Sequence, residues 1–342
     1  MGDENQTGTI YFHFHPFSMV PGVQMLIFVA FLLMYLVSIL GNVTVGLLIW
    51  ANPSLHSPMY FFLANLAALE ICYSSTIAPL TLANVLSVGN GFISLVGCGT
   101  QMFFFIFLGS TDCIVLAVMA YDRFVAICQP LLYPLIMRRQ LCVRLAVGSL
   151  ALGLTMAVPL TVLIFRLPFR RNGEIGLFYC DVLPVIRLAS ADTRLHEAVV
   201  LAFSVVALTI PFLFIATSYV FIVATVLRIR SAEGRSKAFS TCSSHLTVVV
   251  LQYGCTSLIY LCPSSSYSPE RGRVLSVIYT FITPVLNPVI YGLRNQEFKN
   301  ALKRALRKDK GEWSMLQFQS NQGFPEDCAI IDIVTTSIAA QN

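Results

Sequence analysis

Long runs of apolar residues, separated by short polar segments, dominate the pattern of this chain. Each run is long enough to cross the hydrocarbon core of a bilayer, which takes about 20 helical residues. None alternates with the period of two that a barrel strand shows, so helices are expected. The predicted spans are residues 25–50, 59–86, 99–127, 141–165, 198–229, 240–262 and 275–293. The pattern therefore predicts an all-α membrane protein, a seven-transmembrane helix bundle over residues 25–293.

Composition supports this interpretation. Hydrophobic residues make up 56% of the chain and charged residues only 11%, with a mean hydropathy of +0.74. These values lie outside the range of soluble globular domains. We expect membrane lipid as a partner and no nucleic acid.

Basic residues cluster at one set of span ends, which predicts that these ends are cytoplasmic. They are Arg123, Arg138, Arg139, Arg144, Arg228, Arg230, Arg235, Lys237 and the segment 294–310. An odd number of spans then places residues 1–24 outside the cell, where Asn5 heads a glycosylation sequon. This tail lacks a basic start and a short apolar core, so the first helix is expected to act as its own insertion signal.

The segment after the last span has apolar residues at helical spacing among lysines and arginines. Residues 294–310 are therefore expected to form an amphipathic helix along the inner leaflet, where basic side chains meet anionic lipid. Residues 311–342 are expected to be a disordered cytoplasmic tail.

Two cysteines differ from the others, most of which fall within or at the ends of spans. Cys98 opens the third span and Cys180 lies in the long loop 165–197, both on the expected outer, oxidising side. We predict that they form a disulfide that holds this loop across the bundle mouth.

Two acids lie within spans, Glu70 in the second and Asp112 in the third. Ionisable residues inside a membrane are costly and are therefore functional candidates. One interpretation is a shared sodium site in the bundle core, since hard oxygen ligands suit this ion. The alternative is that each acid is neutral or hydrogen-bonded to Ser74, Ser110 or Asn42.

Two features near the cytoplasm suggest a conformational switch. Asp122 and Arg123 are adjacent in the sequence. The acid can hold the guanidinium in one of two arrangements, and such a contact, called here a latch, can break as a signalling switch requires. The alternative is an arginine that only extends to the interface. In the last span, Pro284 and Pro288 remove backbone donors, and Asn287 can bond to the freed carbonyls, which predicts a hinge.

At this point the sequence resembles a known family, the rhodopsin-like G-protein-coupled receptors and, within them, the olfactory receptors. The resemblance extends over residues 16–310. It rests on PMYFFLANLAALEICYSS (58–75), MAYDRFVAICQPLLYP (119–134), SY (218–219), KAFSTCSSHLTVV (237–249) and PVLNPVIYGLRN (284–295), in this order.

The resemblance implies an odorant receptor of the plasma membrane, with its amino terminus outside and its carboxyl terminus inside. It implies coupling to a stimulatory G protein of the olfactory type, which raises cyclic AMP. It also implies the residues of the switch: Asp122, Arg123, Tyr219, Lys237, His245, Asn287, Pro288 and Tyr291. Arg123, released from Asp122, and Lys237 would face the G protein.

Residues at helical spacing in four spans predict a ligand pocket, and these positions match where the family binds odorants. They are Phe105, Ile106, Gly109, Ser110, Phe203, Ala207, Tyr253, Thr256, Ser257, Tyr260 and Thr280. Ordinary core packing is the alternative. An apolar cavity with a few hydroxyls suits a small, neutral, mostly hydrophobic volatile.

Charged ligands are less expected. Amine receptors place an aspartate where Phe105 stands. Arg166, Arg170, Arg171 and Arg187 in the long loop suggest an acidic metabolite as an alternative ligand. However, this loop also contains Glu174, Asp181 and Asp192, which is more simply explained by a solvated surface.

Other function classes fit less well. A transporter would show paired halves with broken helices, and no internal repeat is visible. A membrane enzyme would need a cluster of catalytic or metal-binding side chains, whereas His245 is the one histidine within a predicted span. We expect no enzymatic activity and, apart from the sodium ion, no cofactor.

Overall fold

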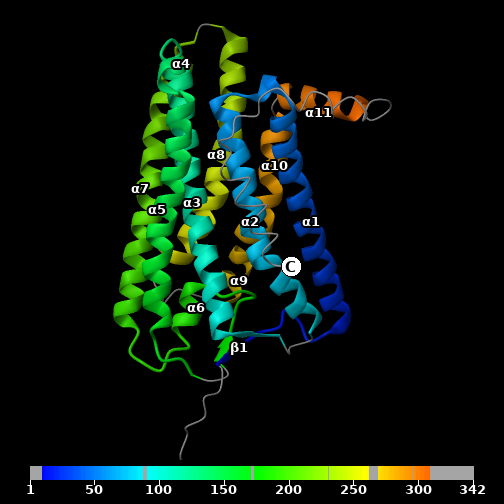
Figure 1. The fold of residues 1–342 in the computed structure, drawn as a ribbon, viewed down its shortest axis with the longest axis vertical. Coiled ribbons are helices and arrows are strands. Elements are labelled where there is room, and N and C mark those ends of the chain that lie inside the picture. Colours follow the sequence, from blue (N-terminus) through cyan, green and yellow to red (C-terminus); the bar gives the residue numbers. More distant parts are fainter. Residues whose placement is uncertain are drawn as a thin grey trace, which may run out of the picture.

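The computed structural model describes residues 10–87, 91–170, 173–229, 231–261, 269–294 and 296–308. Long helices run side by side along the bundle (Figure 1). They are α1 (Pro21–Ala51), α2 (Pro58–Leu86), α3 (Leu95–Cys128), α5 (Arg139–Phe165), α7 (Arg194–Leu227) and α8 (Ala232–Tyr260). The last helix combines α9 (Pro269–Val277), the π-helical turn η3 (Ile278–Ile282) and α10 (Thr283–Arg294). The seven-helix bundle predicted from the sequence is confirmed.

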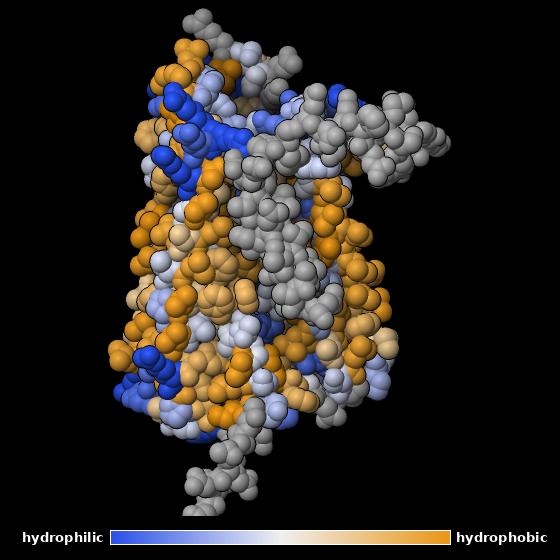
Figure 2. Space-filling model, viewed as in Figure 1, coloured by the Kyte–Doolittle hydropathy of each residue, from blue (hydrophilic) through white to orange (hydrophobic). Residues whose placement is uncertain are grey.

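Six helices of the described chain are long and apolar enough to cross a membrane. The helix outside this set is α8, because its first half reads AEGRSKAFSTCSSH and is polar. It nevertheless packs within the bundle against α3, α7 and α10. Figure 2 shows apolar side chains along the length of the bundle and polar ones gathered toward its two ends, as a bilayer requires.

Several helices begin earlier than hydropathy predicts. The sixth begins at Ala232 instead of residue 240, and the seventh at Pro269 instead of residue 275. Hydropathy marks only the part of a helix that suits the bilayer core, whereas backbone hydrogen bonding continues into polar surroundings.

Close approaches between helices depend on glycine. A Cβ atom at Gly153 of α5 would lie 2.2 Å from Oγ1 of Thr111 and 2.9 Å from the carbonyl oxygen of Phe107, both on α3. At Gly41 of α1 a Cβ atom would lie 2.8 Å from Cγ of Pro288. Small residues let membrane helices pack closely where no hydrophobic effect drives them together.

A three-stranded sheet covers one end of the bundle, called here the disulfide end. Strand β1 (Tyr11–Phe14) lies between β2 (Phe92–Ser94), which is antiparallel to it, and β3 (Gly173–Ile175), which is parallel. Within the predicted extracellular tail, the backbone of residues 11–14 is therefore paired with the loops that contain β2 and β3.

The predicted disulfide between Cys98 and Cys180 is confirmed, with a Cα–Cα distance of 5.5 Å. Gln101 reinforces it, since its Oε1 accepts a hydrogen bond from the backbone N–H of Cys180 at 2.9 Å. The Nε2 of Gln101 donates to the carbonyl oxygen of Thr76 on α2, also at 2.9 Å. The loop after α5 is thus fixed to α2 and α3 near the short helix α6 (Val182–Ile186).

The opposite end carries η1 (Pro53–Leu55), α4 (Tyr133–Ile136) and α11 (Gln296–Lys308), and is called here the α11 end. Helix α11 lies across the bundle rather than along it (Figure 1). Phe298 and Ala301 are buried, whereas Lys303 and Arg304 are exposed. Tyr60 of α2 donates a hydrogen bond to Oε2 of Glu297 at 3.0 Å, which links α11 to the bundle.

Candidate functional site

Four aromatic side chains, called here the aromatic cluster, meet inside the disulfide end: Tyr73, Phe105, Tyr179 and Tyr279. The ring centroid of Phe105 lies 5.7 Å from that of Tyr73, 5.0 Å from that of Tyr179 and 6.2 Å from that of Tyr279. Helices α2, α3 and η3 and the loop before α6 supply one ring each. Phe105 was predicted as a pocket residue, and the structure places it at the centre of this cluster.

A small enclosed cavity adjoins the aromatic cluster and shares Tyr73 and Tyr279 with it. Its other lining residues include Gly109, Asp112, Glu70 and Gln252. The volume of about 10 Å³ holds about one water molecule. A larger ligand therefore requires the aromatic rings to move apart.

The remaining predicted pocket residues are distributed less tightly. Ile106, Ser110, Phe203, Ala207 and Ser257 are half-buried, and none of them lines this cavity. Thr256 and Thr280 are buried, but their hydroxyls donate to carbonyls of their own helices at 2.6 Å.

Tyr253 lies on the same helix face and was also predicted to contact a ligand. Its hydroxyl donates to the carbonyl oxygen of Cys113 on α3 at 2.7 Å. In this structure it joins α8 to α3.

The expectation that the charged residues of the long loop are solvated is wrong for Asp181. Asp192 is 73% exposed at its side chain, but Asp181, next to the disulfide, is only 1% exposed. Its Oδ1 accepts hydrogen bonds from the backbone N–H of Val182 at 2.7 Å and from the hydroxyl of Tyr260. Burial raises the pKa of Asp181 to about 6, and these hydrogen bonds limit the rise.

Three of the loop arginines, Arg166, Arg170 and Arg187, are exposed, whereas the aromatic cluster is buried. Arg171 lies outside the described residues.

The hydroxyls of Tyr179 and Tyr279 are hydrogen-bonded to each other, and that of Tyr179 lies 3.4 Å from Oγ of Ser276. Burial raises the pKa of Tyr179, so its hydroxyl remains protonated.

Glu70 and Asp112 both line the small cavity, as the prediction of a shared site requires. Glu70 accepts a hydrogen bond from Nδ2 of Asn287. Oδ1 of Asp112 is buried without a hydrogen-bond partner in the described part of the chain. The neighbours proposed from the sequence do not bond to these carboxylates: Ser74 bonds to the Glu70 carbonyl at 2.7 Å, and Asn42 bonds to the carbonyl oxygens of Ser38 and Pro284.

The predicted role of Asn287 therefore needs correction. It bonds to Glu70, whereas the Pro284 carbonyl is satisfied by Asn42 of α1 at 3.1 Å. The turn before Pro284 is π-helical, a local change that often marks functional sites. Helices α1, α2 and α10 are thus joined by side-chain amides.

At the α11 end, the predicted latch between Asp122 and Arg123 is not present. No ion pair joins them within the described residues. Oδ1 of Asp122 instead accepts a hydrogen bond from the hydroxyl of Tyr133 in α4, at 2.8 Å. Adjacent residues on a helix point in different directions, so Asp122 reaches α4 while Arg123 points elsewhere.

Arg123 is 7% exposed, and its Nε is buried without a partner in the described chain. A buried guanidinium nitrogen without an acceptor is costly. The Nε of this arginine therefore has a hydrogen-bonding capacity that no group of the described chain meets.

A second polar contact joins three helices in this region. The hydroxyl of Tyr219 on α7 lies 2.9 Å from Nδ1 of His245 on α8, and Nε2 of His245 lies 3.0 Å from the carbonyl oxygen of Leu116 on α3. Because a carbonyl only accepts, Nε2 carries the proton and Nδ1 accepts from Tyr219. His245 is fully buried and holds α3, α7 and α8 together.

The other predicted switch residues differ in their burial and in their contacts. Tyr291 is buried, and its hydroxyl has no partner among the described residues. Pro288 packs against Gly41 of α1. The backbone of Lys237 lies in α8, but its side chain, Asn5 and the segment 311–342 lie outside the described residues.

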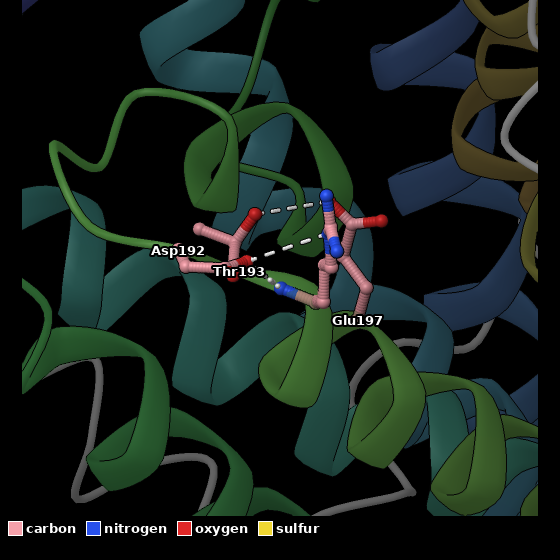
Figure 3. Close-up of polar contacts among 4 residues, drawn as sticks. Asp192, Thr193 and Glu197 are labelled. Carbon is pink, nitrogen blue, oxygen red and sulfur yellow. Dashed lines mark hydrogen bonds and ion pairs between the residues drawn. The ribbon is translucent and has the colours of Figure 1, made fainter.

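The start of α7 shows what a solvated part of the long loop looks like (Figure 3). Oδ1 of Asp192 accepts from the backbone N–H of Arg194 at 3.1 Å, and the hydroxyl of Thr193 donates to Oε1 of Glu197 at 3.1 Å. The ion pair between Arg194 and Asp192, at 3.9 Å, joins side chains that are 94% and 73% exposed. Such pairs add little stability, and these contacts mark the start of α7.

Sequence reasoning missed several residues of the site, namely Tyr73, Gln101, Tyr133, Tyr179, Ser276 and Tyr279. Most are polar aromatic residues that ordinary packing explains equally well. For Asp181 a signal was available, because an acid directly after a disulfide cysteine is held where the bridge places it.

The chain is similar in sequence to known receptors. The family profile described as "Olfactory receptor" matches residues 31–309. The chain is 63% identical over 304 residues to human olfactory receptor 10V1, covering 89% of this chain and 98% of the relative. It is 53% identical to human olfactory receptor 10Q1 (88% and 95%) and 46% identical to human olfactory receptor 10A7 (89% and 96%).

Proposed function

Because the chain belongs to the olfactory receptor family, a family of multi-pass plasma membrane receptors that couple to G proteins, we propose which ligand it binds and how it signals. It binds small, mostly neutral, hydrophobic volatiles at the disulfide end. It then activates a stimulatory G protein of the olfactory type at the α11 end, and cyclic AMP rises. The family match over residues 31–309 carries this proposal, and the geometry of the two ends supports it.

The proposed orientation places the disulfide end outside the cell. Disulfides form in oxidising compartments, and the bridge between Cys98 and Cys180 lies at this end. Exposed basic side chains lie at the α11 end, as expected for a cytoplasmic face. They are Arg138, Arg139, Arg144, Arg228, Arg235, Lys303 and Arg304.

The proposed ligand site is the aromatic cluster with the cavity beside it. Its walls are mostly aromatic rings and leucines, with the polar side chains Glu70, Asp112 and Gln252 on the cavity side, which suits a mostly apolar molecule with a polar group. The cavity as described is far smaller than an odorant. Ligand binding therefore separates Phe105 from Tyr73 or Tyr279 and changes how α2, α3 and η3 pack.

The proposed switch uses the contacts at the α11 end. Outward movement of α8 breaks the hydrogen bond between Tyr219 and His245 and opens the space around Arg123. Arg123 then contacts the G protein, with Lys237 on the same moving helix. Ligand binding favours this state only as far as the ligand binds it more tightly than the closed one.

A sodium ion between Glu70 and Asp112 is part of the same proposal. The residues fit, since two carboxylates share one cavity and Oδ1 of Asp112 is buried without a partner in the described chain. Two acids alone do not complete a coordination shell, and no group of three acidic, histidine or cysteine side chains is placed for a metal among the described residues. Sodium should raise the melting temperature of wild type but not of Asp112→Asn, and an equal rise in both would exclude the site.

The function is tested by measuring cyclic AMP in cells that express this chain with the olfactory-type G protein, against a panel of small neutral volatiles. Phe105→Ala should lose the response at equal surface expression. Phe104→Ala is the matched control, because this neighbouring ring is 41% exposed and faces away from the cluster. A receptor at the surface that answers no volatile would argue against this ligand class.

A further inference from the structure

Asp181 is a buried acid that the proposed signalling mechanism does not use. It lies at the disulfide end, one residue after the cysteine that pins the loop. It is 1% exposed, and within the described part of the chain its side chain forms hydrogen bonds but no ion pair with a basic side chain. Buried charges in proteins are usually paired, so an unpaired acid that is ionised at neutral pH requires an explanation.

Several hydroxyl groups lie near Asp181. Its hydroxyl partner, Tyr260, comes from α8, while Tyr179, Ser276 and Tyr279 form a hydrogen-bonded set beside it. We call these five residues the Asp181 cluster. Tyr179 and Tyr279 also belong to the aromatic cluster around Phe105, and the backbone N–H of Asp181 donates to the Tyr179 carbonyl oxygen at 3.1 Å, so the acid adjoins the proposed ligand site.

We propose that Asp181, with the hydroxyls of Tyr179, Tyr260 and Tyr279, binds the polar head group of the ligand, and that this group is a hydrogen-bond donor. This inference rests on the proposed odorant-binding function and specifies its ligand class. An ionised carboxylate only accepts hydrogen bonds, so it favours a hydroxyl or amino group. It disfavours an aldehyde, which offers only an acceptor, and repels a carboxylate.

The apolar part of such a ligand lies along the aromatic cluster. Tyr73 and Phe105 offer uncharged ring faces, and neither supplies a carboxylate for an ammonium group. A neutral alcohol therefore satisfies both parts of the site. A primary amine satisfies the Asp181 cluster and tests whether charge adds to the donor effect.

A purely structural role for Asp181 makes a different prediction. The acid caps α6 through Val182 and receives the hydroxyl of Tyr260, so it also stabilises the loop. Asn at this position keeps an oxygen that accepts both hydrogen bonds but removes the charge. Asp181→Asn therefore separates loop stability from ligand recognition.

The experiment compares dose–response curves for 1-octanol, octylamine, octanal and octanoic acid, and for the same four head groups on shorter and longer chains, by cyclic AMP at equal surface expression. Wild type should respond to the alcohol or the amine at about tenfold lower concentration than to the aldehyde and the acid, as expected for a hydrogen bond to a charged group. Asp181→Asn should reduce this difference to about threefold or less. Asp192→Asn, an exposed acid in the same loop, is the control and should keep it.

A second variant keeps the test decisive if Asp181→Asn does not reach the surface. Tyr260→Phe removes the hydroxyl that Asp181 holds but leaves the carboxylate, so the preference for donors should persist. A preference for donors that disappears in Tyr260→Phe while the responses themselves remain, or an unchanged preference in Asp181→Asn, would overturn the assignment of Asp181 while leaving the receptor function intact. Absence of any response by wild type at the surface would count against the receptor function itself.

Discussion

The hydroxyl of Tyr219 lies 2.9 Å from Nδ1 of His245, and their rings stack with centroids 5.8 Å apart. This contact joins α7 to α8 in the buried interior of the α11 end. Tyr219→Phe keeps the ring and leaves Nδ1 without a donor, which should destabilise the receptor by about 1–3 kcal/mol. Thermal unfolding in detergent measures this effect. Tyr121→Phe on α3 is the control, because Tyr121 is half-buried and its hydroxyl has no hydrogen bond in the described chain; an equal loss there would remove the special role of Tyr219.

Arg123→Ala should abolish the cyclic AMP response while surface expression remains measurable. The Nε of Arg123 has no hydrogen-bond partner in the described chain, so removal of this nitrogen leaves no acceptor unsatisfied. Its proposed partner is the G protein. Retained signalling in this variant would refute that role.

Gly153→Ala should lower the melting temperature and surface level of the receptor. The added Cβ meets the Phe107 carbonyl oxygen at 2.9 Å, and backbone cannot move aside as a side chain can. Overpacking of this kind costs about 1–3 kcal/mol. Gly148→Ala on the same helix is the matched control, since nothing lies within 4 Å of its Cβ position. If both variants behave alike, helix propensity and not close packing determines the outcome.

Removal of the disulfide by the double substitution Cys98→Ser and Cys180→Ser should lower stability substantially. The bridge closes a loop with a sequence separation of 82 residues, for which the chain-entropy estimate is about 4–5 kcal/mol. The hydrogen bond from Cys180 to Gln101 is expected to loosen with it. Thermal unfolding of wild type under oxidising and reducing conditions, compared with the variant, measures the effect. A variant as stable as oxidised wild type would contradict it.

Asp181 predicts a specific dependence of stability on pH. Its pKa is about 6 in the folded protein and near the ordinary 3.8 when unfolded, so the folded state binds the proton more tightly. Stability from this group therefore rises as pH falls through 6, and is lost again as pH rises. Between pH 7.5 and pH 5, wild type should gain about 1–1.5 kcal/mol relative to Asp181→Asn, which has no titrating group at this position. A stability difference that stays constant over this range would show that Asp181 is not buried as described.

The helices and the disulfide followed from the sequence because both depend on features that are local along the chain. Apolar length alone places a helix in a bilayer, and two cysteines on one side of the membrane have few possible partners. The polar contacts between helices were predicted poorly. Asn287, for example, bonds to Glu70 and not to the carbonyl that Pro284 exposes, because the rotation of α10 against α2 decides its partner.

In the candidate site, too, the contacts between different elements could not be predicted from the sequence. Phe105 was found from its position on α3, but the rings that surround it come from α2, the loop before α6 and η3. Asp181 was misjudged because loop residues are usually solvated, and only the path of the loop across the bundle buries this one. Asp122 was assigned to its neighbour in sequence, although its partner, Tyr133, lies on another element.

The strand order β2–β1–β3 has a consequence for how the protein is made. Strand β1 precedes every helix, yet its partners are residues 92–94 and 173–175, which emerge from the ribosome only after the second and fourth long helices. The first described strand must therefore wait, unpaired, until half of the chain has been inserted. Pairing across such sequence distances is slow, so completion of this sheet is a late step at which newly made receptor is open to quality control.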